Sequence, residues 1–510
     1  MTAERASGIL LHPTCLPGPN GIGDIGEQAF RFLEFLSDAG QTLWQVLPLG
    51  PTGYGDSPYA CFSSFAGNPL LVSLAALAEK RLLPAEELQS APAFPEGRVD
   101  YGAVIRWKTP LLRRAAVRFL QSVQGARRDD FESFREAESW WLSDFCLFMA
   151  IKRVFKGAWN PSWDRDIALR EPSSMDRYRR ELSGDIAVEE VIQFFFFSQW
   201  DALRRAAAQR GIRIIGDLPI FVAPDSADVW AHRDLFLLDA NGSPTAVSGV
   251  PPDYFAATGQ LWGNPLYDWD ALASHGFDFW VQRIRAARRM FDLVRIDHFR
   301  GFEACWSVPA GEATAERGSW VPVPGRELFR AIEAALGPVP IIAEDLGVIT
   351  PEVTALRESL GFPGMRILQF AFDSRESGAL GPENRFLPHN HTRESVVYTG
   401  THDNDTTRGW YAGRSESERA QLDSYAPPTE REVEWRLIRM ALSSVCKYAV
   451  VPLQDVLGLG TEARMNTPGT SSGKNWTWRM QEKHFDQAAA ERLRSLSLLY
   501  GRTRPPSETM

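Results

Sequence analysis

Cysteine is scarce in this 510-residue chain, and the few cysteines present are widely spaced. No CxxC pair occurs, so the sequence offers neither a zinc ribbon nor a dithiol redox motif. Scattered single thiols are typical of a reducing compartment, and the short apolar run before Pro13 does not fit a secretory signal. We therefore expect a cytoplasmic protein. The five cysteines are Cys15, Cys61, Cys146, Cys305 and Cys446.

A long hydrophobic run and an excess of positive charge are also missing. The most apolar stretch, Phe194–Phe197, is far shorter than the roughly 20 residues that a membrane-spanning helix needs. The formal net charge is −9, which is the opposite of the basic surface typical of a nucleic-acid-binding protein. Neither a membrane nor a nucleic acid is an expected partner.

The composition is that of a globular protein, with 44% apolar and 23% charged residues. Length alone would predict about three domains. However, no internal repeat, low-complexity tract or Gly/Ser-rich linker divides the chain. The 17 tryptophans are numerous enough to serve both the core and a flat ligand. We expect residues 1–510 to form one domain with large insertions.

Eight short runs rich in Val, Ile, Leu and aromatic residues predict buried parallel strands, because such strands are apolar on both faces. Helical patterns lie between them, and this alternation predicts an α/β fold, a (β/α)₈ TIM barrel. An open doubly wound sheet is the alternative, but it would need a glycine-rich phosphate loop after the first strand, and PGPNGIGD lacks that spacing. The predicted strands lie at 8–16, 42–50, 212–222, 291–302, 339–347, 365–372, 395–404 and 447–459.

Two segments are too long to be simple connections between strands and helices. Residues 52–205, approximately, carry helical periodicity and predict a mostly helical inserted subdomain between the second and third strands. Residues 223–276, approximately, are rich in Pro, Gly, Asp and Trp and predict an inserted, structured loop region near the substrate.

Polar clusters follow several of the predicted strands, where the reactive groups of such barrels lie. A charged side chain in an apolar strand is costly unless it is paired or used. An isolated pair such as Arg295 and Asp297 could be structural, but carboxylates that converge from three strand ends favour an active site. The residues concerned are Asp217, Arg295, Asp297, His298, Glu344, Asp345, His402 and Asp403, with His12 after the first strand.

Two kinds of chemistry fit carboxylates that meet at a barrel mouth. Metal-assisted hydrolysis would use Asp and His ligands, although the barrel-rim His-x-His of such enzymes is missing. Glycosyl transfer needs a carboxylate nucleophile and a protonated carboxyl group, and a nearby Arg keeps the nucleophile ionised. Glycosyl transfer accounts for more of the residues. The candidate metal ligands would be His12, His298, His402, Asp297 and Asp403.

The motifs VRIDHFRG, IIAEDLG and TGTHDND, in this order, are similar to strand-end motifs of the α-amylase-like clan. Three further segments resemble the amylomaltase or 4-α-glucanotransferase family, also called disproportionating enzymes, in its compact bacterial form. The resemblance extends from Gly8 to about Arg479. The three segments are GDSPYACFSSFAGNP at 55–69, PPDYFAATGQLWGNPLYDW at 251–269 and RMNTPGTSSGKNWTWR at 464–479.

The resemblance implies roles for particular residues. Asp297 corresponds to the family's nucleophile, Glu344 to its general acid/base and Asp403 to its transition-state-stabilising carboxylate. Other positions correspond to residues that contact the glucan. Those around the transferred sugar are Tyr59, Asp217, Arg295 and His402; those near the acceptor are Ser57, Gln260, Trp262, Asp373 and Asn466; and Tyr54 and Tyr101 resemble tyrosines that guide long glucans outside the active site.

The implied activity is transfer of α-1,4-glucan segments to the 4-hydroxyl of glucose or a malto-oligosaccharide. It would proceed by retaining double displacement through a covalent glucosyl-Asp intermediate, without a metal or organic cofactor. The loops at 250–268 and 456–476 would cover the site and limit the access of water. Three alternatives remain open: a retaining α-glucan hydrolase, a metal hydrolase, and a non-catalytic glucan-binding barrel.

Overall fold

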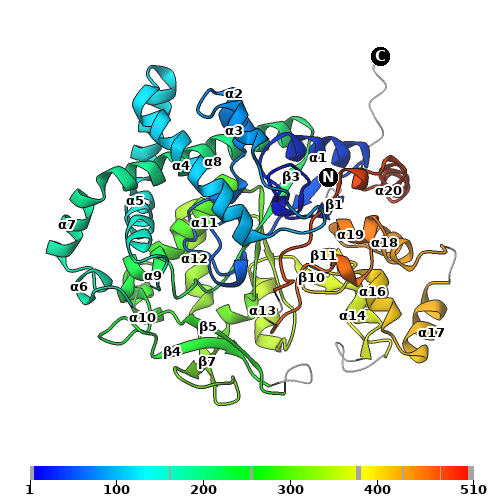
Figure 1. Ribbon diagram of the computed structural model, residues 1–510. Helices are drawn as coiled ribbons and strands as arrows, with labels where there is room; N and C mark the ends of the chain where they lie inside the picture. The colour runs from blue at the N-terminus through cyan, green and yellow to red at the C-terminus, as the bar shows by residue number, and fades with distance from the viewer. Residues whose placement is uncertain are drawn as a thin grey trace.

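The computed structural model describes residues 5–159, 162–252, 257–374, 381–427, 430–470 and 473–503. Eight parallel strands form one sheet that curls into a nearly closed barrel, in the order β10-β11-β12-β1-β2-β3-β6-β9 (Figure 1). Each overlaps one of the eight strands expected from the sequence, so the predicted (β/α)₈ barrel is confirmed. The strands are β1 (Ala6–Leu10), β2 (Leu43–Gln45), β3 (Arg213–Leu218), β6 (Leu293–Ile296), β9 (Ile341–Ala343), β10 (Gly364–Ile367), β11 (Ser395–Tyr398) and β12 (Tyr448–Pro452).

The strands form where the sequence is continuously apolar, and nearly every strand residue is buried. Helices precede most strands and cover the outside of the barrel. In α12, for example, Leu328, Phe329 and Ile332 form one buried face, and Gly337 ends the helix with a positive φ of 69°. The covering helices are α1 (Glu27–Asp38), α8 (Ser183–Gln209), α11 (Asp278–Met290), α12 (Gly325–Leu336), α13 (Pro351–Ser359), α18 (Val433–Ser443) and α20 (Gln487–Leu499).

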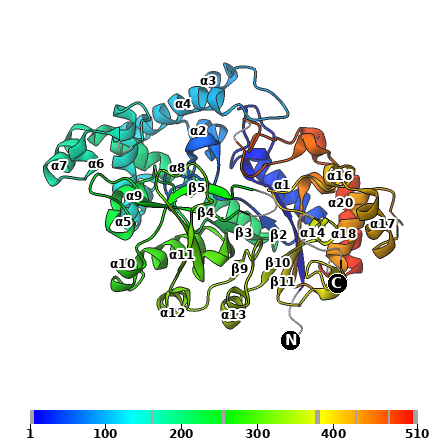
Figure 2. The same ribbon diagram turned by 90° about the horizontal axis from the view of Figure 1, so that it is seen from below.

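The long segment between β2 and β3 is largely helical and lies on one side of the barrel in both ribbon views (Figures 1 and 2). α4 and α5 pack against α8 through aromatic residues, such as the edge-to-face contacts of Phe119 with Phe195 at 5.7 Å and of Phe131 with Phe194 at 5.5 Å. That the segment between β2 and β3 is a separate subdomain stays a prediction. Its helices are α2 (Leu74–Glu79), α3 (Ala85–Gln89), α4 (Tyr101–Ser122), α5 (Ala126–Val154), α6 (Arg165–Ala168) and α7 (Pro172–Glu181).

The second inserted region contains regular structure that the sequence did not reveal. Strands from 246–265 pair antiparallel with strands from 304–322, so the expected structured loop is partly a second sheet. Residues 253–256, within the motif at 251–269, lie outside the described residues, as do residues 471–472 within the motif at 464–479. The strands of this sheet are β4 (Ala246–Val250), β5 (Gln260–Pro265), β7 (Ala304–Pro309) and β8 (Ser319–Pro322).

Shorter helices complete the fold. On the opposite side of the barrel from the helical insertion, α16 and α17 lie near α18 in both views (Figures 1 and 2). None of the described helices combines the length and the apolar character needed to cross a membrane. Besides short 3-10 helices, the remaining described α-helices are α9 (Ala227–Ala231), α10 (Trp269–Ser274), α14 (Leu368–Ala371), α16 (Thr407–Ala412), α17 (Glu416–Tyr425) and α19 (Leu453–Val456).

Candidate active site

Three neighbouring strands of the barrel bring polar residues of the predicted site to one rim. β3 and β6 pair so that Asp217 lies opposite Arg295, and β6 pairs with β9, which ends one residue before Glu344. Since parallel strands end at the same edge of a sheet, the side chains that follow them meet at one end of the barrel. Residues distant in the sequence therefore become neighbours.

Arg295 forms the centre of a buried charge cluster. Its Nη1 donates to both carboxylate oxygens of Asp217, at 2.7 and 2.6 Å, and its Nη2 donates to Asp297 Oδ1 at 3.0 Å. Burial alone would lower the pKa of Arg295, but the two carboxylates outweigh burial and hold that pKa well above its usual value. The Asp217 side chain is fully buried, whereas 31% of the Asp297 side chain faces solvent. Asp297 is thus a carboxylate with a fixed counter-charge, open to the mouth of the barrel.

Glu344 has a different environment from Asp297. Its carboxyl group is buried and accepts hydrogen bonds from the backbone N–H groups of His298, at 2.7 Å, and Leu346, at 3.0 Å. Burial raises the pKa of Glu344 to about 8; the Arg295 charge opposes this rise and the Asp297 charge adds to it. A carboxyl group that stays protonated at neutral pH can act as a proton donor. The two carboxyl groups therefore suit two different roles.

A strained turn connects the two carboxyl groups. His298 directly follows Asp297 and has φ 51° and ψ 52°, a left-handed conformation that residues other than glycine rarely adopt. This turn directs the His298 N–H toward Glu344 Oε2. Burial lowers the pKa of the His298 imidazole to about 4, so the ring is neutral at neutral pH. The strain is located where the chain leaves β6 for the site.

Asp403 reaches the site on the loop after β11. Asn466 Nδ2 donates to Asp403 Oδ1 at 2.7 Å, and Arg464 Nη2 donates to the Asp403 carbonyl oxygen at 2.7 Å. The Asn466 N–H also donates to the His402 carbonyl oxygen at 3.1 Å. The segment after β12 therefore fixes both the backbone and the side chain of Asp403, and 44% of that side chain stays exposed.

An aromatic wall stands beside the charge cluster. The Tyr59 ring stacks on His402 with centroids 5.3 Å apart, and Trp476 contacts both rings. The Tyr59 hydroxyl donates to Asp217 Oδ2 at 2.8 Å, so the His402 Nε2–H donates to the Tyr59 oxygen at 2.8 Å. Burial raises the pKa of Tyr59 well above its usual value, which keeps the hydroxyl protonated. His402 Nδ1 is buried without a partner among the described residues.

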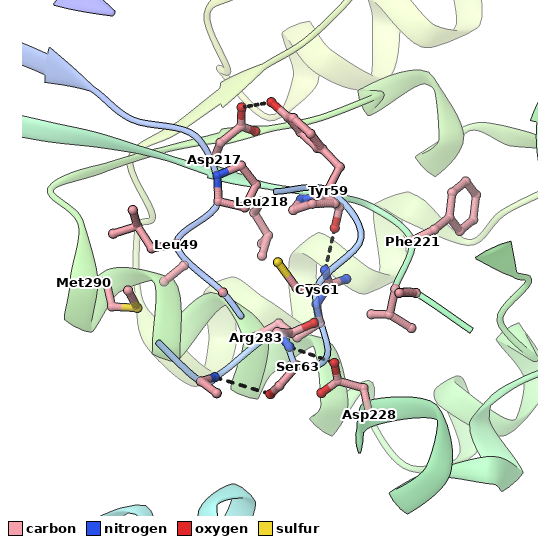
Figure 3. Close-up of a pocket in the computed structure, with 18 of the residues that line it drawn as sticks. Leu49, Tyr59, Cys61, Ser63, Asp217, Leu218, Phe221, Asp228, Arg283 and Met290 are labelled. Atoms are coloured by element: carbon pink, nitrogen blue, oxygen red, sulfur yellow. Dashed lines mark hydrogen bonds between the residues drawn. The ribbon is translucent and has the colours of Figure 1, made fainter. Parts of the chain in front are cut away.

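Tyr59 also lines a cavity next to β3 (Figure 3). Tyr59 and Asp217 share its wall with apolar residues such as Leu218 and Phe221, and with Cys61. Tyr59 and Asp217 therefore belong both to this cavity and to the polar cluster around Arg295.

Three further predicted residues lie close to this cluster. The Ser57 hydroxyl accepts the Tyr59 N–H at 3.2 Å. Trp262, on β5, lies edge-on to His298 with centroids 4.7 Å apart and donates its indole N–H to Gln260 Oε1 at 3.3 Å. The small antiparallel sheet thus brings Gln260 and Trp262 beside the residue that follows Asp297.

Other predicted residues are placed differently. Tyr101 is buried and donates its hydroxyl to the Trp476 carbonyl oxygen at 3.1 Å, so the expected surface role in guiding a glucan is corrected to a packing role. Asp373 is buried in an ion pair with Arg414, and its acceptor-side role stays a prediction. Tyr54 is 87% exposed, and its contact with long glucans also stays a prediction.

Sequence reasoning missed two contributors to the site, Trp476 and Arg464. Both lie in the motif at 464–479, from which only Asn466 was carried over. Trp476 has a positive φ of 65°, and its N–H donates to the Met465 carbonyl oxygen. Their proximity to Asn466 in the sequence was the available signal.

The candidate metal ligands do not gather around one point within the described residues. His12 is buried, and burial lowers the pKa of its imidazole to about 3. Across the described ranges, no group of three or more His, Cys, Asp and Glu side chains has the geometry of a metal site.

Comparison with known proteins gives a consistent result. Residues 11–485 match the model of a family described as 4-alpha-glucanotransferase. A 4-alpha-glucanotransferase of Thermus thermophilus is 51% identical over 98% of this chain and 99% of its own length. A 4-alpha-glucanotransferase of Synechocystis is 50% identical over the same shares of the two chains.

Solved structures agree with this fold. The amylomaltase of Streptococcus agalactiae, determined in complex with acarbose, aligns with a TM-score of 0.93 at 38% identity, covering 98% of this chain and 100% of its own. The amylomaltase of Corynebacterium glutamicum aligns with a TM-score of 0.76 at 20% identity over 97% of this chain and 75% of its own, a likeness of fold alone.

Proposed function

This chain belongs to the 4-alpha-glucanotransferase family, and on that basis we propose that Asp297, Glu344 and Asp403 carry out glucan transfer at the barrel mouth. The substrates are α-1,4-glucans and malto-oligosaccharides. The observation that carries the proposal is the contrast between the two carboxyl groups. Asp297 is paired with Arg295 and open to solvent, while burial raises the pKa of Glu344 to about 8. Retaining glycosyl transfer needs one carboxylate and one carboxylic acid.

The first half of the reaction breaks the glucan. Asp297 attacks the anomeric carbon of the donor sugar and forms a new C–O bond, while the bond to the glycosidic oxygen breaks. Glu344 gives its proton to that departing oxygen, so the released glucan leaves with a free 4-hydroxyl. Asp403, held by Asn466 at 2.7 Å, binds donor hydroxyls as the oxocarbenium-like transition state develops.

The second half rebuilds an α-1,4 bond. The 4-hydroxyl of an acceptor sugar gives its proton to the Glu344 carboxylate and attacks the anomeric carbon. The bond to Asp297 breaks, and both side chains return to their starting states. Two inversions at one carbon retain its configuration. Because water can replace the acceptor, the balance of transfer and hydrolysis depends on sugar contacts at the acceptor side.

Several residues bind the glucan in this scheme. Tyr59 and His402 form the wall beside the transferred sugar. Trp262 offers a half-exposed ring on the acceptor side. Other groups contribute less directly: Ser57, Gln260 and Asn466 supply polar groups, Asp217 and Arg295 hold the charge cluster, Asp373 supports the acceptor side, and Tyr54 contacts longer chains outside the site.

Incubation with maltotriose tests the proposal. Transfer produces glucose together with a ladder of longer malto-oligosaccharides. Hydrolysis instead raises the number of reducing ends without longer products, and that result would assign the chain to the alternative, a retaining α-glucan hydrolase. The same assay in a strong chelator tests the expected independence from metals. Loss of activity there, restored by a divalent metal, would favour the metal hydrolase.

A further inference from the structure

The barrel has one incomplete seam, and that seam lies beside Glu344. β9 and β10 stand at the two ends of the strand order. Within the described ranges, one main-chain hydrogen bond links the two sides, from the Ala343 N–H to the Pro363 carbonyl oxygen at 2.9 Å. Every other pair of neighbouring barrel strands has a continuous ladder. Backbone groups on β10 therefore need other partners.

Side chains supply those partners. Asp345 Oδ1 accepts the Met365 N–H at 2.7 Å, and Arg366 Nη1 donates to the Met365 carbonyl oxygen at 2.7 Å. Gly364 leaves room for the carboxylate, because a Cβ at that position would lie 2.5 Å from Asp345 Oδ2. The Asp345 side chain thus takes the place of a main-chain acceptor and continues the ladder across the seam.

Glu344, which directly precedes Asp345, is bound to the β6 side of the seam. The Glu344 N–H donates to the Ile296 carbonyl oxygen at 3.0 Å, and the Phe299 N–H donates to the Glu344 carbonyl oxygen at 3.0 Å. Glu344 is therefore bound to the β6 side and Asp345 to β10. A shift of Asp345 would be transmitted through one peptide unit to the Glu344 carboxyl group.

The seam is also a concentration of positive charge. Three guanidinium groups approach the buried Asp345 carboxylate: Arg357 at 3.4 Å, Arg366 at 3.5 Å and Arg385 at 4.0 Å. Arg385 additionally donates to the Asp345 carbonyl oxygen at 2.6 Å. One carboxylate thus serves three cations in a region where unpaired charge is costly.

We propose that Asp345 is a positioning residue for Glu344, which closes the barrel seam and sets the charge that the Glu344 carboxyl group experiences. The inference rests on the proposed role of Glu344 as the acid/base. It extends that role to a side chain directed into the barrel wall, away from substrate.

The charges around Glu344 and Asp345 determine whether a substitution raises or lowers the pKa of Glu344. Glu344 is influenced by Arg295 and Asp297 from the β6 side, together with the His298 and Leu346 N–H groups, and by Arg385 from the seam. Replacing the Asp345 carboxylate with an amide leaves more net positive charge near Glu344. Positive charge favours the ionised form of Glu344 and lowers its pKa. Removing the Arg385 charge has the opposite effect. The groups that face Asp345 are Arg357 from α13, Arg366 from β10 and Arg385 from the 381–387 segment.

The experiment is the pH profile of kcat/KM for transfer from maltotriose. Asp345→Asn keeps the acceptor for the Met365 N–H but loses the charge, so we expect kcat to fall about tenfold with little change in KM. The alkaline limb should move down by about one pH unit, the scale of one nearby charge at protein-like screening. Arg385→Gln should move this limb upward, and Arg385→Lys, which keeps the charge, should leave it in place.

The outcomes are distinguishable. An alkaline limb that stays in place in both Asp345→Asn and Arg385→Gln overturns the inference. Should Asp345→Asn fail to fold, Arg385→Gln tests the inference alone, because the Arg385 side chain is half-exposed. Arg385→Lys is then the reference. Glu344→Gln tests the underlying role separately. If Glu344→Gln keeps near-full activity, the proposed function fails, whereas an inactive Glu344→Gln with unmoved limbs refutes only the positioning role of Asp345.

Discussion

Two buried arginines at opposite ends of the barrel have contrasting partners. At the mouth, Arg295 pairs with two carboxylates. At the base, Arg502 has no carboxylate partner among the residues that the structure describes and donates instead to backbone carbonyl oxygens. Burial lowers its pKa to about 9, helped by the nearby Arg5. The acceptors belong to the end of α18, the segment before β12 and the first residue of β1: Ala441, Leu442, Ser444, Cys446 and Ala6.

The buried arginine side chain has a different use at each end of the barrel. Five donors in a planar fork allow Arg502 to satisfy the last carbonyl oxygens of a helix and to join both ends of the chain. At the mouth, the same group organises carboxylates, one of which remains exposed. We therefore expect changes at the mouth to affect catalysis without loss of the fold, and changes at the base to do the reverse.

The largest expected effect is at the mouth. Asp297→Asn removes the nucleophile while keeping its shape, so kcat should fall about 10³-fold or more. The melting temperature should change little, since Asp297 is partly exposed. Transfer from maltotriose and thermal unfolding measure the two quantities. Asp176→Asn, at an exposed ion pair on α7, is the matched control, and near-full activity in Asp297→Asn would refute the assignment.

The pH profile of kcat/KM is a second test of the catalytic groups at the mouth. Because the pKa of Glu344 is raised to about 8, its acid form persists through neutral pH and is lost as the pH rises above that value. We expect kcat/KM to fall about tenfold per pH unit beyond pH 8. Melting temperatures at each pH distinguish this loss from unfolding. A profile that begins to fall near pH 5 would show that Glu344 does not act as a buried acid.

At the base, the expected effect is on stability. Arg502→Met removes a donor shared by several buried carbonyl oxygens and should lower the free energy of unfolding by about 3 kcal/mol. Activity per folded molecule at 25 °C should stay within about twofold. Thermal and urea unfolding measure the loss, and Arg317→Met, at a highly exposed arginine, is the control. An unchanged melting temperature would remove the proposed distinction between the two arginines.

The smallest effects come from a matched pair of hydroxyl deletions. Tyr59→Phe removes the link between Asp217 and His402 and should lower kcat/KM about tenfold, corresponding to one or two hydrogen bonds. Tyr101→Phe removes a hydroxyl bonded to the Trp476 carbonyl oxygen and should cost about 1 kcal/mol of stability with little kinetic effect. Equal kinetic losses in both variants would contradict the packing role assigned to Tyr101.

The barrel itself was predictable because its strands are buried on both faces and therefore continuously apolar. The small antiparallel sheet was not, because β4 and β7 pair across more than 50 residues and carry no sustained alternation. Tyr101 shows a second limit. The family resemblance placed Tyr101 at the surface, but its ring packs with Ile22, Leu70 and Val99 in a buried cluster that forms only in the folded chain.

The sequence by itself determined which side chains lie at or just after the ends of the barrel strands, and in what order: Asp217, Arg295 with Asp297, Glu344, and His402 with Asp403. Tertiary structure decided which of them meet and how each one ionises. Burial and neighbouring charge are properties of three-dimensional surroundings, so two carboxyl groups of similar chemistry become an ion-paired carboxylate and a carboxylic acid. The same holds for Asp345, whose seam function exists only once the eight strands close into a barrel.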